Sequence, residues 1–268
     1  MKASVKQLDF SRGFNVVACL FLFVTLLLSG CVTTERGGIG TKVDDDQAVE
    51  DSVRLARAYI QRQNWGAAKR HLKIALEIDD SSAVVHEALG LVFQNTGEVE
   101  VAEQHYKKSI KLDNRLSRVR NNYAVFLYQQ SRFKEAALQL ERVVADTLYD
   151  KRAASYVNLG RSYLQLNELE KAEDAFTHAH LMDRRNVPLL FELAETYFQL
   201  EDFSNAQRFY DAYRSQVKQQ PARALWLGIR LADTFNNKDA LSSYVLALKN
   251  LYPTSNETLE YYRIYGKK

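Results

Sequence analysis

The chain has 268 residues, of which 36 are Lys or Arg and 33 are Asp or Glu, so its formal net charge at pH 7 is +3. Residues 1–30 hold three of the basic residues and one of the acidic ones, and their removal as an export signal leaves 33 against 32, a net charge of +1. This near-neutral balance gives no electrostatic support for nucleic-acid binding. Cys19 and Cys31 are the only cysteines, so the chain after them has no thiol for a disulfide, a metal site or nucleophilic catalysis.

Residues 1–30 have the layout of a cleavable export signal. An apolar stretch from Phe14 to Leu28 follows three basic residues, Lys2, Lys6 and Arg12. An uncleaved membrane anchor would need about 20 apolar residues, and Asn15 and Thr25 interrupt this shorter run. An ordinary secretory signal would end in an A-x-A-like site, which this segment lacks.

The segment Leu28-Ser29-Gly30-Cys31 resembles the lipobox of bacterial lipoproteins, in which the thiol of the last residue is acylated and the chain is cut just before it. The resemblance implies that Cys31 becomes the lipidated first residue of the mature protein, carrying palmitate-type acyl chains. In enterobacterial lipoproteins an Asp in the next position retains the protein in the inner membrane, whereas Val32 follows here. The implied location is therefore the periplasm-facing side of the outer membrane. We expect no cofactor besides this covalent lipid.

Residues 31–48 are expected to form a lipidated flexible tether. They contain three glycines and the acidic run Asp44 to Asp46, with little to bury and no helical or strand period. The acidic run is interpreted as solvated charge just before a helix N-terminus, where negative charge is favourable, rather than as a ligand site.

Six segments after residue 48 match one 34-residue pattern: 49–82, 83–116, 117–152, 153–186, 187–220 and 221–254. Position 7 is a large residue in each segment, namely Leu55, Leu89, Tyr123, Leu159, Leu193 and Leu227. Position 8 is small, namely Ala56, Gly90, Ala124, Gly160, Ala194 and Gly228. Large and small residues at this spacing place one apolar stripe on a first helix and allow a second helix to approach closely.

This pattern resembles the tetratricopeptide repeat (TPR) family, which implies an all-α, right-handed superhelix of six helix-turn-helix repeats. Position 32, usually Pro in the family, is never Pro here, so we expect turn and cap residues to end the repeats. The sixth repeat departs most, because Asn237 stands where a bulky residue should follow the inter-helix turn. Residues 255–268, with Leu259, Tyr262 and Tyr265 at helical spacing, are predicted to form a helix that caps the open end.

No catalytic or metal-binding constellation is apparent, so the sequence predicts no enzyme. His178 and His180 are two residues apart and point to different sides of a helix, and His71, His86 and His105 lack metal-ligand spacing. Most of the tyrosines fall on core positions of the repeats.

Function is then expected from the concave face that stacked repeats create. In TPR proteins positions 2, 5, 9 and 12 of the first helices line this face. The candidate groove residues are Val53, Arg57, Val84, Glu87, Leu91, Gln94, Asn121, Val125, Tyr128, Val157, Arg161, Leu164, Phe191, Glu195, Phe198, Leu225 and Ile229. They predict an apolar groove with few charges, suited to an extended peptide or an amphipathic helix. The alternative is that some of them pack on neighbouring repeats. The Lys/Asn/Arg set of chaperone-type carboxylate clamps is not reproduced.

A lipobox, a short tether and six TPRs together resemble the PilF/PilW type IV pilus pilotins of Gram-negative bacteria. That resemblance implies a lipoprotein that binds subunits of the pilus secretin, brings them to the outer membrane and promotes their multimerisation, with no nucleic-acid or small-molecule ligand. The alternative is an envelope adaptor resembling NlpI, which presents substrates to a protease or a cell-wall hydrolase. The sequence alone leaves the contacting repeats and the oligomeric state open.

Overall fold

The structure is a computed structural model that describes residues 44–266. The signal segment 1–30, the lipidation residue Cys31 and the tether up to residue 43 lie outside the described residues, as do Lys267 and Lys268. The described part contains thirteen α-helices and no strand. None of these helices is both long and apolar enough to cross a membrane.

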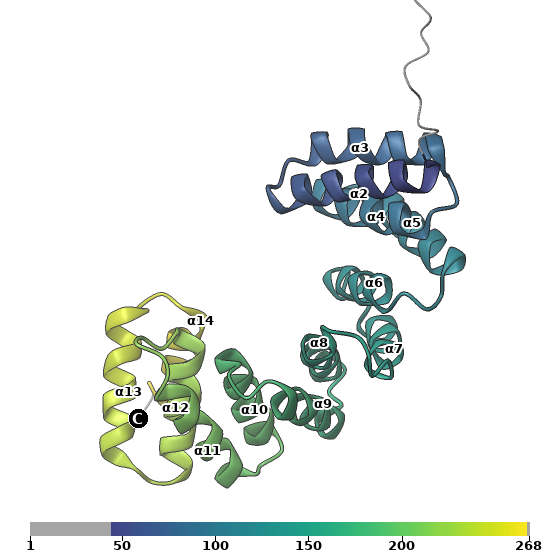
Figure 1. Cartoon of the computed structure of the whole chain (residues 1–268). Coiled ribbons are helices and arrows are strands. Elements are labelled where there is room, and N and C mark those ends of the chain that lie inside the picture. The colour runs from purple at the N-terminus through teal and green to yellow at the C-terminus, as the bar shows by residue number, and fades with distance from the viewer. Residues whose placement is uncertain (1–43, 267–268) are drawn as a thin grey trace, which may run out of the picture. The chain divides into compact units, whose positions relative to one another are not determined.

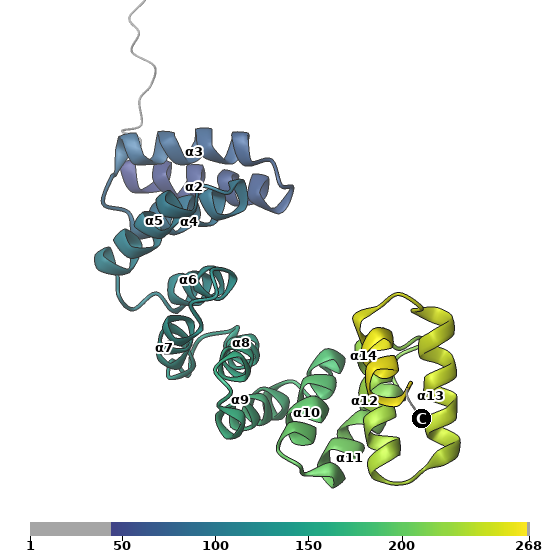
Figure 2. The ribbon, with the colours of Figure 1, turned by 180° about the vertical axis from the view of Figure 1, so that it is seen from behind.

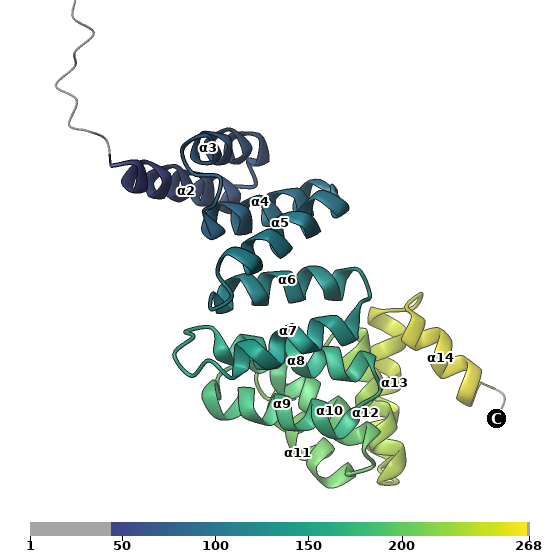
Figure 3. The same cartoon turned by 90° about the vertical axis from the view of Figure 1, so that its right-hand side faces the viewer.

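Twelve of the helices form six antiparallel pairs, which confirms the expected all-α TPR fold (Figure 3). The pairs are α2 (Asp45–Gln61) with α3 (Trp65–Ile78), α4 (Ala83–Thr96) with α5 (Val99–Leu112), α6 (Ser117–Gln129) with α7 (Phe133–Val144), α8 (Arg152–Gln165) with α9 (Leu169–Met182), α10 (Val187–Gln199) with α11 (Phe203–Arg214), and α12 (Ala222–Thr234) with α13 (Lys238–Leu251). We call the members of each pair the first and second helix of a repeat. A last helix, α14 (Asn256–Tyr265), follows the sixth pair.

The first helix begins four residues earlier than the expected start of the repeats at residue 49. Asp45 and Asp46 lie in the first turn of α2 and not ahead of it. Carboxylates in a first turn favour the helix by interacting with its unpaired N–H groups and its dipole. Asp45 and Asp46 therefore belong to the folded array while Asp44 precedes α2, and the predicted end of the tether at residue 48 falls inside this helix.

The turn inside each repeat has the same backbone form. One residue adopts a positive φ between the two helices, and these residues are Gln63, Gly97, Ser131, Asn167, Glu201 and Asn236. The next residue caps the second helix, and in three repeats its side chain accepts a hydrogen bond from the third helical N–H, as Asn64, Asp202 and Asn237 do. Asn237 is thus a cap rather than a misplaced core residue, because the turn of the sixth repeat lies one residue further along.

Short acidic turns end several repeats, as expected from the missing prolines. The carboxylates of Asp79, Asp113 and Asp183 each accept a hydrogen bond from the backbone N–H two residues later, at 2.8, 2.9 and 3.1 Å. Such local turns stop the second helix and direct the chain into the next repeat.

The core lies between the paired helices and between consecutive repeats. Tyr106, Phe126, Phe176 and Tyr210 are among the largest fully buried side chains. A Cβ placed on Gly160 would lie 2.5 Å from the ring of Phe176, so the small residue at position 8 is what admits a large aromatic side chain from the second helix.

One position of the repeat pattern is not buried. Leu55 is 46% exposed, whereas the equivalent Leu227 of the sixth repeat is fully buried. Position 7 packs against the preceding repeat, and among the residues that the structure describes α2 belongs to the first repeat. The sequence pattern assigned Leu55 to the core, and this assignment was wrong for the end of the array.

The two helices of each repeat take opposite sides of the array. First helices contact the next first helix directly, in the pairs α2 with α4, α4 with α6, α6 with α8, and α10 with α12. In Figures 1 and 2 they follow one another along one side, which we call the inner face, while the second helices lie on the other.

Candidate partner-binding face

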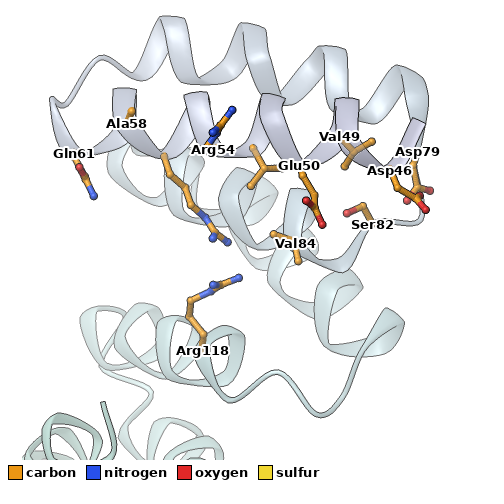
Figure 4. A pocket seen from close by; sticks show the side chains of 12 residues that line it. Asp46, Val49, Glu50, Arg54, Ala58, Gln61, Asp79, Ser82, Val84 and Arg118 are labelled. Carbon is orange, nitrogen blue, oxygen red and sulfur yellow. The ribbon is translucent and has the colours of Figure 1, made fainter. Parts of the chain in front are cut away.

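The amino-terminal part of the inner face contains a hollow of about 820 Å³ (Figure 4). Three predicted groove residues, Val53, Arg57 and Val84, line it. Val53 is nevertheless buried between the first two repeats and contributes little open surface. Arg118, at the start of α6, reaches the same hollow from the third repeat.

A buried carboxylate lies beneath this hollow and joins three repeats. The Glu87 side chain, only 4% exposed, accepts hydrogen bonds from Arg57 Nη2 at 2.9 Å and from Asn122 Nδ2 at 2.6 Å. Arg118 Nη2 lies 3.3 Å from the same carboxylate without hydrogen-bond geometry. We call this set the Glu87 cluster. The Glu87 cluster contains two guanidinium groups and one carboxylate, so these three side chains together carry a net charge of +1.

A second, smaller hollow of about 280 Å³ lies between the third and fourth repeats. Val125, Tyr128 and Arg161, all predicted groove residues, line it. This is the most apolar open part of the inner face, with Ala124 and Leu140 also in its wall. It matches the expected groove best.

The carboxyl-terminal part of the inner face is charged, which the sequence interpretation did not anticipate. Glu192 Oε1 accepts hydrogen bonds from Arg161 Nε and Nη2 at 3.1 and 3.0 Å, and Glu195 Oε1 accepts one from Arg230 Nη2 at 2.7 Å. Arg223 lies at ion-pair distance from both carboxylates, 3.9 Å from Glu192 and 3.4 Å from Glu195. We call these residues the Glu192/Glu195 cluster, and its three arginines again exceed its two carboxylates by one charge.

Arginines also cover the aromatic residues that were expected to line an apolar groove here. The Arg223 guanidinium lies 5.0 Å from the ring centroid of Phe191, and that of Arg230 lies 4.5 Å from Phe198. Such stacking is attractive because the ring face is electron-rich. Phe191 is buried and Phe198 is half-buried, so neither offers a bare apolar surface.

Two expected groove residues, Leu225 and Ile229, are buried. Leu225 and Ile229 form a buried cluster with Leu248 of α13, and Tyr261 and Tyr265 of α14 pack against it. The hydroxyl of Tyr265 also donates to Asp233 Oδ2 at 2.7 Å. The last helix therefore occupies the inner face of the sixth repeat, beside α12 (Figures 1 and 2).

The remaining predicted groove residues mainly connect neighbouring repeats. Gln94 donates to Gln129 at 2.8 Å and accepts from the Tyr106 hydroxyl at 2.7 Å, and Asn121 accepts from Ser155 at 2.9 Å. Val157 and Leu164 pack against the central core. The alternative that some groove positions serve packing is correct for these residues, whereas Leu91 is half-buried and stays partly open to solvent.

A repeat-spaced charge pattern was the signal that the sequence reasoning missed. The hydrogen-bonded partners Arg57 and Glu87 are 30 residues apart, Arg161 and Glu192 are 31 apart, and Glu195 and Arg230 are 35 apart. Opposite charges separated by about one repeat face each other on adjacent first helices. Asn122, 35 residues from Glu87, adds an uncharged donor at the same spacing.

Two of the histidines, His86 and His105, form a pair, whereas the sequence predicted separate helical residues. His86 Nδ1 lies 2.7 Å from His105 Nδ1, and His86 Nε2 lies 3.0 Å from the carbonyl oxygen of Asp80. Burial lowers the pKa of both rings, that of His105 to about 4. Within residues 44–266 no group of three or more His, Cys, Asp or Glu side chains is arranged to hold a metal ion.

Comparison with known proteins agrees with this architecture. Three overlapping segments, 53–117, 87–151 and 124–181, match the tetratricopeptide repeat family. The protein is thus a TPR scaffold, a class whose stacked helices form extended binding surfaces.

The relatives define the family more closely. The chain is 38% identical over 248 residues to the type IV pilus assembly protein PilF of Pseudomonas aeruginosa, covering 92% of this chain and 98% of that protein. A solved structure of Pseudomonas aeruginosa PilF superposes with a TM-score of 0.74, covering 82% of this chain and 99% of that one. The crystal structure of the pilus biogenesis factor PilW, 21% identical over 80% of this chain and 98% of its own, shares the fold with a TM-score of 0.69. The chain belongs to the PilF family.

Proposed function

We propose that this chain is an outer-membrane lipoprotein, anchored through acyl chains on Cys31, that acts in type IV pilus biogenesis. In this proposal it binds subunits of the pilus secretin on its inner face and promotes their localisation to the outer membrane and their multimerisation. The observation that carries the proposal is the near full-length similarity to PilF, which is named as a type IV pilus assembly protein. The lipobox-like segment before Cys31 supports the anchor.

The open parts of the inner face suit a protein partner better than a small molecule. The hollow lined by Val125 and Tyr128 offers an apolar anchor point, and the neighbouring Arg161 adds a charged rim. Such a combination fits a peptide segment laid along the array. The contact is expected to include Val84 and Leu91, on the repeats next to the tether.

Deletion of the gene tests the function directly. We expect the secretin polypeptide to be made but to shift from heat-stable multimers to monomers, with loss of surface pili, as seen by immunoblotting inner- and outer-membrane fractions. A Tyr128→Glu chain, which places a charge in the second hollow, should fold normally by circular dichroism yet fail to restore the multimers. Normal multimers in the deletion strain would overturn the proposal and favour the adaptor hypothesis.

The anchor has its own test. Cys31→Ala should leave the helicity and melting of the protein unchanged, since Cys31 precedes the repeats, but should release it from the outer membrane. Several acyl chains give lasting membrane attachment, whereas one gives only marginal binding. Sedimentation of the Cys31→Ala protein with outer membrane, in a strain that lacks the secretin, would contradict the lipidation proposal.

A further inference from the structure

A hollow of about 560 Å³ lies between the fourth and fifth repeats and is lined from α9, α10 and α11. Arg184, in the turn after α9, and Arg208 of α11 line it together with His180 of α9. Among residues 44–266, no Asp or Glu side chain belongs to its lining. We call it the basic hollow, because its wall carries two arginines and no carboxylate.

The equivalent hollow one repeat earlier has the opposite charge. It has a similar volume of about 540 Å³ and is lined from α7, α8 and α9. At position 22 of the repeat Arg208 is replaced by Asp174, and at position 28 His180 is replaced by Val144. Its charged lining residues are three carboxylates and one lysine, namely Glu141, Glu170, Asp174 and Lys171. The positive charge is therefore a property of one hollow and not of the repeat pattern.

His180 stands at a position that is aliphatic in four of the other five repeats. Those four residues lie in or against the hydrophobic clusters of the array, and they are Leu76, Ile110, Val144 and Leu248. The imidazole of His180 instead buries its Nδ1 without a hydrogen-bond partner among the described residues, which is unfavourable for folding. Nε2 is then the ring nitrogen that can contact a ligand. A polar ring at a core position indicates a role besides packing.

The two arginines have unused donors. Both side chains are exposed, and within residues 44–266 neither makes a hydrogen bond or an ion pair. The Arg208 guanidinium lies 4.6 Å from the ring centroid of Phe209, and that ring meets His180 edge-on at 5.7 Å and stacks on Tyr197 at 5.5 Å. These ring contacts place Arg208 and His180 close together before a ligand binds, which reduces the conformational freedom lost on binding.

The carboxylates nearest to the basic hollow lie outside its lining. Each accepts a hydrogen bond from another group: Glu173 from the hydroxyls of Thr177 and Tyr197 at 2.9 and 2.6 Å, Asp183 from the backbone N–H of Arg185 at 3.1 Å, and Asp202 from the backbone N–H of Asn205 at 3.1 Å. Burial lowers the pKa of His180, and Arg184 and Arg208 each lower it by more than Asp183 raises it. The charges around the ring are therefore positive on balance, which favours an anion there.

A phosphate group suits these donors better than a carboxylate does. Guanidinium groups match phosphate oxygens in geometry, and a phosphate has enough oxygens to accept from two guanidinium groups and an imidazole at once. The volume falls within the roughly 300 to 1,000 Å³ of small-molecule sites, so the hollow is too large for the ion alone. Phe209 and Leu181, which is 62% exposed, add apolar surface to its wall.

We propose that the basic hollow binds the phosphate group of an organic phosphate ester. Arg184, Arg208 and Nε2 of His180 donate to the phosphate oxygens, and the organic part lies against Leu181 and Phe209. A phospholipid headgroup and a soluble phosphate ester share this chemistry. The site is separate from the inner face, so the inference goes beyond the proposed function and does not depend on it.

The structure supplies variants that remove the donors and keep the fold. Arg184→Gln with Arg208→Gln removes two side chains that have no bonded partner, so the double variant should melt like the parent chain. His180→Leu restores the aliphatic residue found in other repeats and should melt no earlier than the parent. The matched control is Arg70→Gln with Arg142→Gln, which makes the same charge change at exposed arginines of α3 and α7.

Titrations followed by the backbone amide signals in nuclear magnetic resonance test the proposal on the mature chain, residues 31–268 with Cys31→Ala. The probes are glycerol 3-phosphate and dihexanoylphosphatidylglycerol below its micelle concentration, with acetate at equal ionic strength for comparison. We expect saturable shifts in α9 and α11 around His180 and Arg208, and no saturable shift in α7. The better ester should bind the double variant at least about tenfold more weakly, the factor that corresponds to about 1.4 kcal/mol. It should also bind His180→Leu more weakly, and the control variant as tightly as the parent.

The two esters distinguish the source of the phosphate. Tighter binding of dihexanoylphosphatidylglycerol would support a lipid headgroup as the ligand, and tighter binding of glycerol 3-phosphate would support a soluble ester. No saturable shift with either ester, acetate binding as tight as that of the esters, or equal affinity of the parent and both test variants would overturn the proposal. The secretin immunoblot that tests the proposed function has a separate readout, so neither result decides the other.

Discussion

The first and sixth repeats end the array in opposite ways. At the amino-terminal end Leu55 is 46% exposed and the inner face is an open hollow of about 820 Å³. At the other end α14 covers the inner face, and Leu225 and Ile229 beneath it are buried. The same repeat pattern therefore yields binding surface at one end and core at the other, depending on what packs against it.

Removal of α14 is expected to have the largest effect on this contrast. A chain ending at Pro253 would expose Leu225 and Ile229, and loss of about 1.5 to 3 kcal/mol for each buried aliphatic side chain should unfold the sixth repeat locally. Hydrogen exchange should show loss of protection in α12 and α13 and little change in α2 and α3. Unchanged protection in α12 would show that α14 does not act as the cap.

A matched pair of substitutions at position 7 compares the two ends directly. Leu227→Ala should lower the free energy of unfolding by about 2 to 5 kcal/mol, because it leaves a cavity in a fully buried site. Leu55→Ala should cost less than about 1 kcal/mol, because about half of that side chain is already in water. Thermal melts followed by circular dichroism measure both, and equal losses would show that Leu55 is buried in solution.

Position 8 offers a smaller test within the middle of the array. Gly160→Ala places a methyl group 2.5 Å from the fully buried ring of Phe176, and such overpacking should cost about 1 to 3 kcal/mol. In the first repeat the equivalent residues are Ala56 and Leu72, which belong to one buried cluster, so a methyl group is already accommodated at position 8 there. A second variant, Gly160→Ala with Phe176→Leu, should recover part of the loss. No recovery would mean that the contact with Phe176 is not the cause.

A fall in pH should destabilise the second repeat more than the sixth, and this effect should be smaller than those of the substitutions above. The folded-state pKa values of His86 and His105 are lowered, so the unfolded chain binds more protons between pH 6.5 and about 4. Their contribution to stability is present above pH 6.5 and is lost as the pH falls toward about 4. Protection of α4 and α5 should decline over this range more than that of α12 and α13, because the chain has no histidine after His180. His105→Gln should reduce the difference, and an unchanged pH profile in that variant would exclude the histidine pair as its source.

The repeat architecture was predictable because its determinants are local in sequence. The spacing of residues such as Leu89, Gly90 and Ala102 recurs every 34 residues and specifies a helix pair wherever it occurs. A final helix was expected over residues 255–268 from its own apolar spacing, and α14 spans Asn256–Tyr265. Two local predictions were wrong: the first helix starts at Asp45 rather than after residue 48, and the turn of the sixth repeat lies one residue later, so that Asn237 is a cap. Both details depend on capping contacts.

The character of the inner face was predictable only in part. Val125, Tyr128 and Arg161 were correctly expected to lie together, and they share the second hollow. The burial of Leu225 and Ile229, which removes them from the open inner face, was not predictable from their positions in the repeat. It depends on where α14 packs. The guanidinium groups over Phe191 and Phe198 likewise reverse the apolar character inferred from those two rings.

By itself, the sequence determined the fold class, the number of repeats and the helical cap, because each rests on a periodic pattern whose members contact one another within or between adjacent repeats. Only the tertiary structure decided which periodic positions stay open to solvent. Exposure depends on neighbours that are distant in sequence, as for Leu225 and Ile229 beside α14, and on a place at the end of the described array, as for Leu55. The pairing of Arg57 with Glu87 and of Arg230 with Glu195 was decided in the same way, because it requires adjacent first helices to lie side by side.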